Sequence, residues 1–415
     1  MIKKTILFIL LTFCFLLNAA VLYILNSGSE TLSRIDLETG NVNNAFAALG
    51  YMPNRFVCNT QYIYVANSGD NSIQKIESST GATLTNIFLG LNVNPYDLIL
   101  TEDYLFVSGG FSNQIYKIEL ATDTVIDQVT AGNNPAGMAI SGNKLYVGNT
   151  DYMTNYNNCS VSVIDLEAYE VIATIPTATN PQYLLADGDQ VHVSCTGDWS
   201  DVMGTIQIIS ISTDTIVHTI EMGGYCGDLT ITPEGIVYIG DAMNAGVYAY
   251  NAADWTVLYS PAEPFLPGGS VIEADNTNLA VLGGEWGQNF TVNLYELNET
   301  HISDFQVGLY AIDMKFQLQQ SSTDENYVTE AHEVTTYPNP FYNTVTFRTT
   351  DSRSQIETIK IYDIRGRLVK NITSPMLPVW DGKDNSGLPV PSGIYLSIVK
   401  TAANSSTAIR LIKMK

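Results

Sequence analysis

Residues 21–317 repeat a short β-prone motif seven times, and this periodicity constrains the fold more than any other feature of the chain. Consecutive motifs begin 41, 42, 40, 46, 46 and 42 residues apart, which is the spacing of propeller blades. Each is followed by a turn rich in Gly, Asn, Ser and Asp and then by further strand-like runs, with no helical periodicity. The motifs occupy residues 23–25, 64–66, 106–108, 146–148, 192–194, 238–240 and 280–282. Four short strands per unit predict an all-β fold built as a seven-bladed β-propeller.

The two ends of this segment indicate how the propeller closes. The first unit begins at its second strand, whereas residues 308–313 look like an unmatched first strand. Pairing residues 308–313 with residues 21–25 would complete the first blade and remove two exposed strand edges. An open β-solenoid is the alternative, but it would not need this unmatched strand.

The motif with its turn resembles the YVTN family of β-propeller repeats. The nearest matches are residues 64–67, Tyr-Val-Ala-Asn, and residues 146–149, Tyr-Val-Gly-Asn. The resemblance covers residues 21–317 and implies a propeller similar in fold to lactonases and quinoprotein subunits. It therefore leaves open a surface hydrolase or lactonase-like enzyme beside a non-catalytic binding module.

The N-terminus has the pattern of a secretory signal. Lys3 and Lys4 precede an apolar run at residues 5–17 and a small-residue segment at residues 18–20, as in a cleavable signal peptide. The alternative is an uncleaved anchor, although the run is shorter than the roughly 20 apolar residues that span a bilayer. We expect residues 1–20 to be removed, leaving a protein with no transmembrane segment.

The last 98 residues differ from the repeats in charge and in motif. Residues 318–334 are polar and predict a linker, and residues 335–415 hold four ordered motifs. These motifs resemble the type A C-terminal sorting domain of the type IX secretion system, a small immunoglobulin-like β-sandwich of Bacteroidota. The positions that carry the resemblance are Pro338, Asn339, Pro340, Gly366, Trp380, Gly393, Tyr395, Lys413 and Lys415.

The resemblance implies the type IX secretion machinery as a partner. It also implies a protein that is secreted or held at the outer-membrane surface of a Gram-negative bacterium. An ordinary immunoglobulin-like spacer, of the kind that ends flagellar hook-capping proteins, is the alternative.

Charge excludes one class of partner for the repeats. Residues 21–317 contain 33 Asp and Glu but six Lys and Arg. Such a surface repels a phosphate backbone, so we expect no nucleic-acid binding. We expect a monomer.

Three connections that follow the repeated motif are enlarged and aromatic, at residues 151–158, 196–201 and 284–290. Aromatic planes beside polar side chains can stack on sugar rings or hold a peptide, although such aromatics can also simply pack their own loops. The predicted glycan or peptide site consists of Tyr152, Tyr156, Asp198, Trp199, Glu285 and Trp286. His192 and His218 alternate with apolar neighbours, so we interpret both as structural and assign no catalytic residue.

Neither cysteines nor acidic turns indicate a metal or cofactor. Cys58, Cys159, Cys195 and Cys226 allow three disulfide pairings, among which Cys159 with Cys195 is favoured because both lie near corresponding loops of neighbouring repeats. Acidic turns at Asp70, Asp241 and Asp381 would suit calcium, but none has the spacing of an EF-hand loop.

Overall fold

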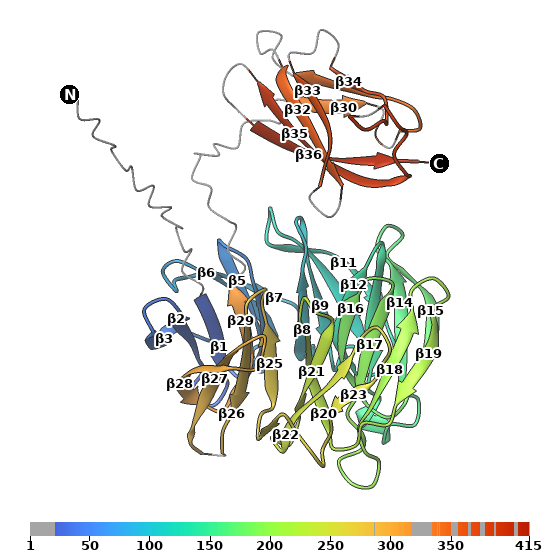
Figure 1. Ribbon diagram of the computed structural model, residues 1–415. Helices are drawn as coiled ribbons and strands as arrows, with labels where there is room; N and C mark the ends of the chain where they lie inside the picture. The colour runs from blue at the N-terminus through green and yellow to red at the C-terminus, as the bar shows by residue number, and fades with distance from the viewer. Residues whose placement is uncertain are drawn as a thin grey trace, which may run out of the picture. The chain divides into compact units, whose positions relative to one another are not determined.

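The chain divides into two compact units, residues 1–321 and 322–415. Figure 1 shows a computed structural model in which both units are built from β-strands. The expected signal peptide, residues 1–20, and all but the last residue of the expected linker lie outside the described residues. The structure describes residues 21–285, 287–317, 334–337, 339, 341–349, 356–363, 367–373, 378–385, 387–401 and 406–414.

The N-terminal unit consists of consecutive antiparallel sheets. The first sheet comprises β29 (Ala311–Gln317), β1 (Val21–Asn26), β2 (Thr31–Asp36) and β3 (Asn41–Ala48). The second comprises β4 (Pro53–Cys58), β5 (Tyr62–Asn67), β6 (Ser72–Glu77) and β7 (Thr83–Phe88). The third comprises β8 (Pro95–Leu100), β9 (Tyr104–Gly109), β10 (Gln114–Glu119) and β11 (Thr124–Thr130). The fourth sheet comprises β12 (Pro135–Ser141), β13 (Lys144–Asn149), β14 (Ser160–Asp165) and β15 (Glu170–Pro176). The fifth comprises β16 (Pro181–Asp187), β17 (Gln190–Cys195), β18 (Thr205–Ser210) and β19 (Thr215–Ile220).

Two further sheets complete this unit. The sixth comprises β20 (Cys226–Ile231), β21 (Ile236–Asp241), β22 (Gly246–Asn251) and β23 (Val257–Tyr259), and β24 (Leu266–Pro267) also pairs with β22. The seventh comprises β25 (Val271–Ala274), β26 (Asn278–Gly283), β27 (Asn289–Glu296) and β28 (His301–Leu309). Among the described residues, the one helical element is a 3-10 turn, η1 (Tyr152–Thr154), and no helix is long and apolar enough to cross a membrane.

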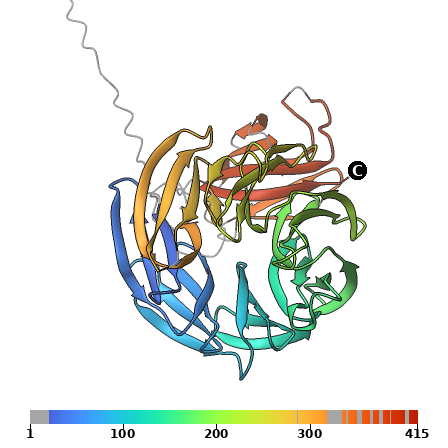
Figure 2. The same ribbon diagram turned by 90° about the horizontal axis from the view of Figure 1, so that it is seen from below.

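The first strands of neighbouring sheets lie against one another. β4 contacts β8, β8 contacts β12, and the series continues through β16, β20 and β25 to β29, which contacts β4. Figure 2 shows the sheets following one another around a common centre. The apolar cores lie between successive sheets, as where Tyr64 and Ile73 of the second sheet pack with Leu105 and Val107 of the third.

The last strand of this unit pairs with the first, as the sequence predicts. β29 is antiparallel to β1, with Val21 opposite Gln317 and Leu25 opposite Asp313. The predicted bounds of the strand, residues 308–313, were wrong, because Leu309 still pairs with Asn289 of β27. Tyr310 then turns the chain with a φ of 47°.

Buried asparagines at the ends of second strands hold the preceding connections. Asn149, at the end of β13, accepts a hydrogen bond from the Gly132 backbone N–H at 2.9 Å and donates to the Ser162 hydroxyl at 2.9 Å. Asn26 makes the same two bonds, to the Gly308 N–H at 2.9 Å and the Ser33 hydroxyl at 2.8 Å. A glycine is required at residue 132, since a Cβ there would lie 2.5 Å from the Asn149 side-chain carbon.

The C-terminal unit contains two sheets. One comprises β30 (Val334–Tyr337), β31 (Val345–Thr349) and β34 (Val379–Trp380), and the other β33 (Leu368–Thr373), β32 (Ile356–Asp363), β35 (Gly393–Thr401) and β36 (Ser406–Lys413). Both sheets contribute to one core, which includes Phe347 and Trp380 from the first sheet and Ile361, Val399 and Leu411 from the second.

The disulfide favoured by the sequence is not formed. Cys58, Cys159, Cys195 and Cys226 are all free cysteines. The Cys159 sulfur lies 3.1 Å from the Thr150 carbonyl oxygen and 3.2 Å from the Asn180 backbone nitrogen, whereas the Cys195 sulfur lies 3.8 Å from the Gln207 side-chain oxygen. Each sulfur is thus directed toward its own set of polar partners.

Candidate functional site

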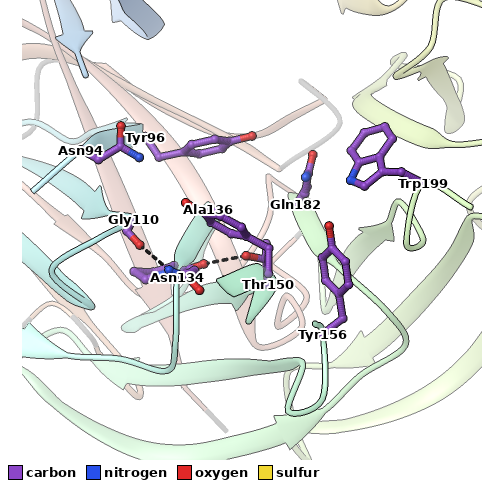
Figure 3. Close-up of a pocket in the computed structure, with 11 residues that line it drawn as sticks. Asn94, Tyr96, Gly110, Asn134, Ala136, Thr150, Tyr156, Gln182 and Trp199 are labelled. Atoms are coloured by element: carbon purple, nitrogen blue, oxygen red, sulfur yellow. Dashed lines mark hydrogen bonds between the residues drawn. The ribbon is translucent and has the colours of Figure 1, made fainter. Parts of the chain in front are cut away.

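A hollow of about 250 Å³ is bounded by three neighbouring sheets (Figure 3). Its walls come from the starts of first strands, the connections that enter them, and the connections between second and third strands. The lining residues are Asn94, Tyr96, Gly110, Asn134, Pro135, Ala136, Thr150, Tyr152, Tyr156, Gln182 and Trp199. Three of the six residues predicted from the sequence, Tyr152, Tyr156 and Trp199, therefore line one hollow.

Buried Asp151 fixes the loop that presents Tyr152 and Tyr156. Its carboxylate accepts hydrogen bonds from the Asn158 backbone N–H at 2.7 Å and the Asn133 side chain at 2.8 Å, and its carbonyl accepts the Tyr156 N–H at 3.0 Å. Burial alone would raise the pKa of Asp151, but hydrogen bonds from Thr154, Asn133 and Asn158 lower it. A carboxylate that stays ionised and bonded gives this loop a defined shape.

Trp199 presents a large apolar surface at the rim of the hollow. Its ring stacks on Tyr225 with a centroid distance of 5.7 Å and an interplanar angle of 23°, and 40% of the residue stays exposed. Tyr152 is 42% exposed. Figure 3 shows Tyr156 and Trp199 beside each other, with Tyr96 placed apart from them. Preformed aromatic surfaces of this kind lose little side-chain entropy when a ligand binds.

The other three predicted site residues do not line the hollow. Asp198 folds its carboxylate onto its own loop, where it accepts the backbone N–H groups of Ser200 at 3.0 Å and Val202 at 2.9 Å. Glu285 is exposed in the connection after β26, in the seventh sheet. Trp286 lies outside the described residues.

A second hollow, of about 310 Å³, lies where the first strands meet, and we refer to it as the channel. The third residue of every first strand lines it: Arg55, Asp97, Gly137, Tyr183, Asp228, Glu273 and Asp313. Lys315, two residues beyond Asp313, lines it as well. Sequence reasoning missed this ring, although the equivalent position in each repeat was the signal that could have found it.

The charged side chains of the channel are paired across different sheets. The Arg55 guanidinium lies 3.6 Å from Asp228 and 3.5 Å from Asp313, and its carbon sits 4.7 Å from the centre of the Tyr183 ring. The Lys315 ammonium lies 2.9 Å from Glu273 and 3.7 Å from Asp313. Two cations are therefore shared among three carboxyl groups, whereas Asp97 lies in the channel outside these pairs.

Burial in the channel shifts proton equilibria. It raises the pKa of Glu273 to about 7 against the attraction of Lys315, and that of Asp97 to about 6 against the attraction of Arg55. Burial also raises the pKa of Asp313. The channel consequently holds carboxyl groups that titrate near neutral pH.

The histidines and acidic turns have structural partners. His192 is fully buried in β17 with its Nδ1 2.6 Å from the Tyr250 hydroxyl, and burial lowers its pKa to about 4. His218 stacks on Trp255 at 4.3 Å. Asp241 accepts the Tyr225 and Met243 backbone N–H groups at 2.9 and 2.8 Å. Across the described residues, no group of three His, Cys, Asp or Glu side chains is arranged to hold a metal ion.

Most of the described residues that carry the sorting resemblance belong to the packing of the C-terminal unit. Trp380 is fully buried, donates its indole N–H to the Lys383 carbonyl at 2.8 Å and contacts the Tyr395 ring with centroids 5.1 Å apart. Lys413 donates to the Val390 carbonyl at 2.8 Å, and Gly393 opens β35 opposite Lys413. Asn339 is exposed. Outside the described residues lie Pro338, Pro340, Gly366 and Lys415.

Comparison with known families identifies this unit. Residues 335–414 match the model described as the secretion system C-terminal sorting domain. The C-terminal unit carries a sorting domain. A sorting domain of this type is handled by the type IX secretion system, so the protein is one destined for secretion or for attachment at the cell surface.

Two further comparisons concern the chain as a whole. No curated protein matches this sequence. Among solved structures, the chain is similar to the computationally designed Ika8 protein, with 13% identity, coverage of 87% of this chain and 96% of that chain, and a TM-score of 0.48.

Proposed function

We propose that the N-terminal unit is a closed seven-bladed propeller of YVTN type, and that it acts as a non-catalytic binding module for a glycan or peptide. Two features of β29 support closure. It pairs with β1, the first strand of the chain, and it contacts β4 of the next sheet, so the end of the unit is joined to its beginning. Closure would leave no exposed inner edge.

The single observation that carries the binding proposal is the convergence of Tyr152, Tyr156 and Trp199 on one hollow. Exposed, immobilised aromatic rings stack on sugar faces and on peptide groups. Asn94 and Gln182 line the same hollow, and their side-chain amides would orient the polar groups of such a ligand.

We further propose that the C-terminal unit is an immunoglobulin-like sandwich of the type A sorting class, as in Bacteroidota, and that residues 1–20 are a signal peptide. The shared core of its two sheets supports the sandwich. Export would then proceed in two steps, first to the periplasm and then across the outer membrane.

A surface hydrolase or lactonase-like enzyme is the second candidate. Asp97 and Glu273, with pKa values raised to about 6 and about 7, have the proton affinities that acid-base catalysis uses near neutral pH. Turnover in a panel of lactones and glycosides that is lost in Asp97→Asn would establish this candidate instead.

The binding proposal is tested with the full chain on glycan and peptide arrays. Trp199→Ala should weaken a hit about five-fold to tenfold, the range expected when an aromatic anchor is removed, whereas Tyr51→Ala, at an exposed aromatic that does not line the hollow, should leave it unchanged. Binding that survives Trp199→Ala and Tyr156→Ala together would refute the assignment of this site.

A further inference from the structure

The aromatic hollow and the channel adjoin each other. Tyr96 and Gln182 line both, and each is the second residue of its first strand, immediately before the ring of third residues. A ligand that occupies the hollow could therefore extend past Tyr96 and Gln182 into the channel, where the carboxyl groups lie.

The channel has a surplus of negative charge. Asp97, Asp228, Glu273 and Asp313 face two cations, Arg55 and Lys315, among the residues that line it. Both cations already pair with carboxylates at 2.9 to 3.7 Å. When all these groups are ionised, four carboxylates and two cations leave the channel with two negative charges in excess.

One carboxylate oxygen in the channel has no hydrogen bond. The Asp228 residue is 8% exposed, and its Oδ2 has no partner although it is buried. A buried acceptor without a partner costs free energy that a bound donor would recover. Asp228 therefore marks a position where the channel can accept an N–H group.

No cation lies among the described residues that line the hollow. The residues lining the hollow are aromatic, aliphatic or neutral polar. Two more lysines of this unit are held by acids elsewhere, Lys75 by Asp123 at 2.8 Å and Lys144 by Asp214 at 2.7 Å. The excess of carboxylates in the adjoining channel favours cations at the hollow, and aromatic faces add to this attraction.

The channel already shows which kind of cation it accommodates. The Arg55 guanidinium sits between two carboxylates and over the Tyr183 ring at 4.7 Å. This arrangement of carboxylates with an aromatic face suits an organic cation, which is less strongly hydrated than a metal ion.

We propose that the hollow and the channel form one site for an organic cation on a flexible chain, with the aromatic rings holding the chain and Asp97 and Asp228 receiving its ammonium or guanidinium group. This inference rests on the proposed binding function and names its ligand class. A Lys or Arg side chain of a peptide and a free polyamine share this chemistry.

Calorimetric titration of the full chain tests the proposal with matched probes. These are the peptide Gly-Lys-Gly with blocked ends, the same peptide with its lysine Nζ acetylated, and spermidine. Acetylation should weaken binding at least tenfold, since it leaves the channel carboxylates without the ligand's charge. Asp228→Asn should weaken the charged probe to a similar degree, whereas Asp103→Asn, at an exposed residue outside both hollows, should not.

The two sources give different results in the same titrations. Tighter binding of Gly-Lys-Gly than of spermidine would assign the site to peptides, and the reverse order would assign it to polyamines. Equal binding of the acetylated and free peptides, both lost in Trp199→Ala, would overturn the cation proposal and keep the binding function. Absence of binding by all probes, together with arrays on which no hit depends on Trp199, would overturn both.

Discussion

The Arg55 guanidinium and the Asp228 carboxylate lie 3.6 Å apart, although they belong to the second and the sixth sheets of the N-terminal unit. Asp313, on the strand that pairs with β1, lies 3.5 Å from the same guanidinium. Three strands that are distant in sequence, β4, β20 and β29, are thus joined at one buried cation.

Removal of Arg55 should destabilise the N-terminal unit strongly. Arg55→Met leaves Asp228 without a cation and Asp313 with Lys315 alone, and it should lower the free energy of unfolding by about 3–5 kcal/mol, measured by urea denaturation. Lys144→Met removes a less buried pair and should cost about 1 kcal/mol or less. Adding Asp228→Asn to Arg55→Met should restore part of the loss, and a double variant no more stable than the single one would contradict this explanation.

Stability should depend on pH through Glu273. Its pKa is raised to about 7 from an ordinary value of 4.5, so between these values the folded state binds more protons than the unfolded state. Stability from this group is therefore present below pH 4.5 and is lost as the pH rises through 7.

The variant Glu273→Gln isolates this contribution. The wild type should lose stability between pH 5 and pH 8, and the variant should not lose this contribution. The free energy of unfolding of the variant minus that of the wild type should therefore increase by about 1–3 kcal/mol over this range. The opposite contribution of His192, whose pKa is lowered to about 4, is common to both proteins and cancels in the difference. Glu221→Gln, at an exposed residue, should show a flat difference, and a flat difference for Glu273→Gln would rule out a protonated Glu273.

The buried asparagines should contribute more to stability than exposed ones. Asn149→Ala removes the acceptor of the Gly132 N–H and the donor to the Ser162 hydroxyl, and should cost about 2–4 kcal/mol because buried groups lose their partners. Asn41→Ala, at an exposed position of β3, should lower the free energy of unfolding by about 0.5 kcal/mol or less. Hydrogen exchange at the Gly132 amide should accelerate in Asn149→Ala; unchanged protection would mean that another acceptor replaces Asn149.

Export should require an intact C-terminal core. Trp380→Ala removes a fully buried indole that packs on Phe341 and Tyr395, a loss of about 3–5 kcal/mol, and should leave the protein in the periplasm on cell fractionation. Leu388→Ala, at a residue 63% exposed, should be exported normally. If a chain that lacks residues 335–415 is still exported, these residues are not a sorting signal.

Much of the N-terminal unit could be predicted because each strand is short and its neighbours are adjacent in sequence. Alternation and turn residues locate β5 and β6 or β13 and β14 without knowledge of the whole. The aromatic hollow was partly visible as well, since enlarged loops stand out against a regular repeat, as for Tyr156 and Trp199.

The channel was not visible, for a physical reason. Arg55, Asp97 and Asp228 each look like an ordinary polar residue within a strand, and only the meeting of first strands brings them together. The role of Asp198 was equally hidden, because whether a loop carboxylate accepts its own backbone N–H groups or faces a ligand depends on turn geometry.

The pairing of Val21 with Gln317 has a consequence for how the chain acquires its structure. Residues so distant in sequence meet only after a very large loop has closed, which is an entropically costly and slow event in folding. The strand that begins the N-terminal unit must therefore wait, with one hydrogen-bonding edge uncovered, until the end of that unit has arrived. During export, this interval is when the protein is most exposed to proteases and to pairing with other chains.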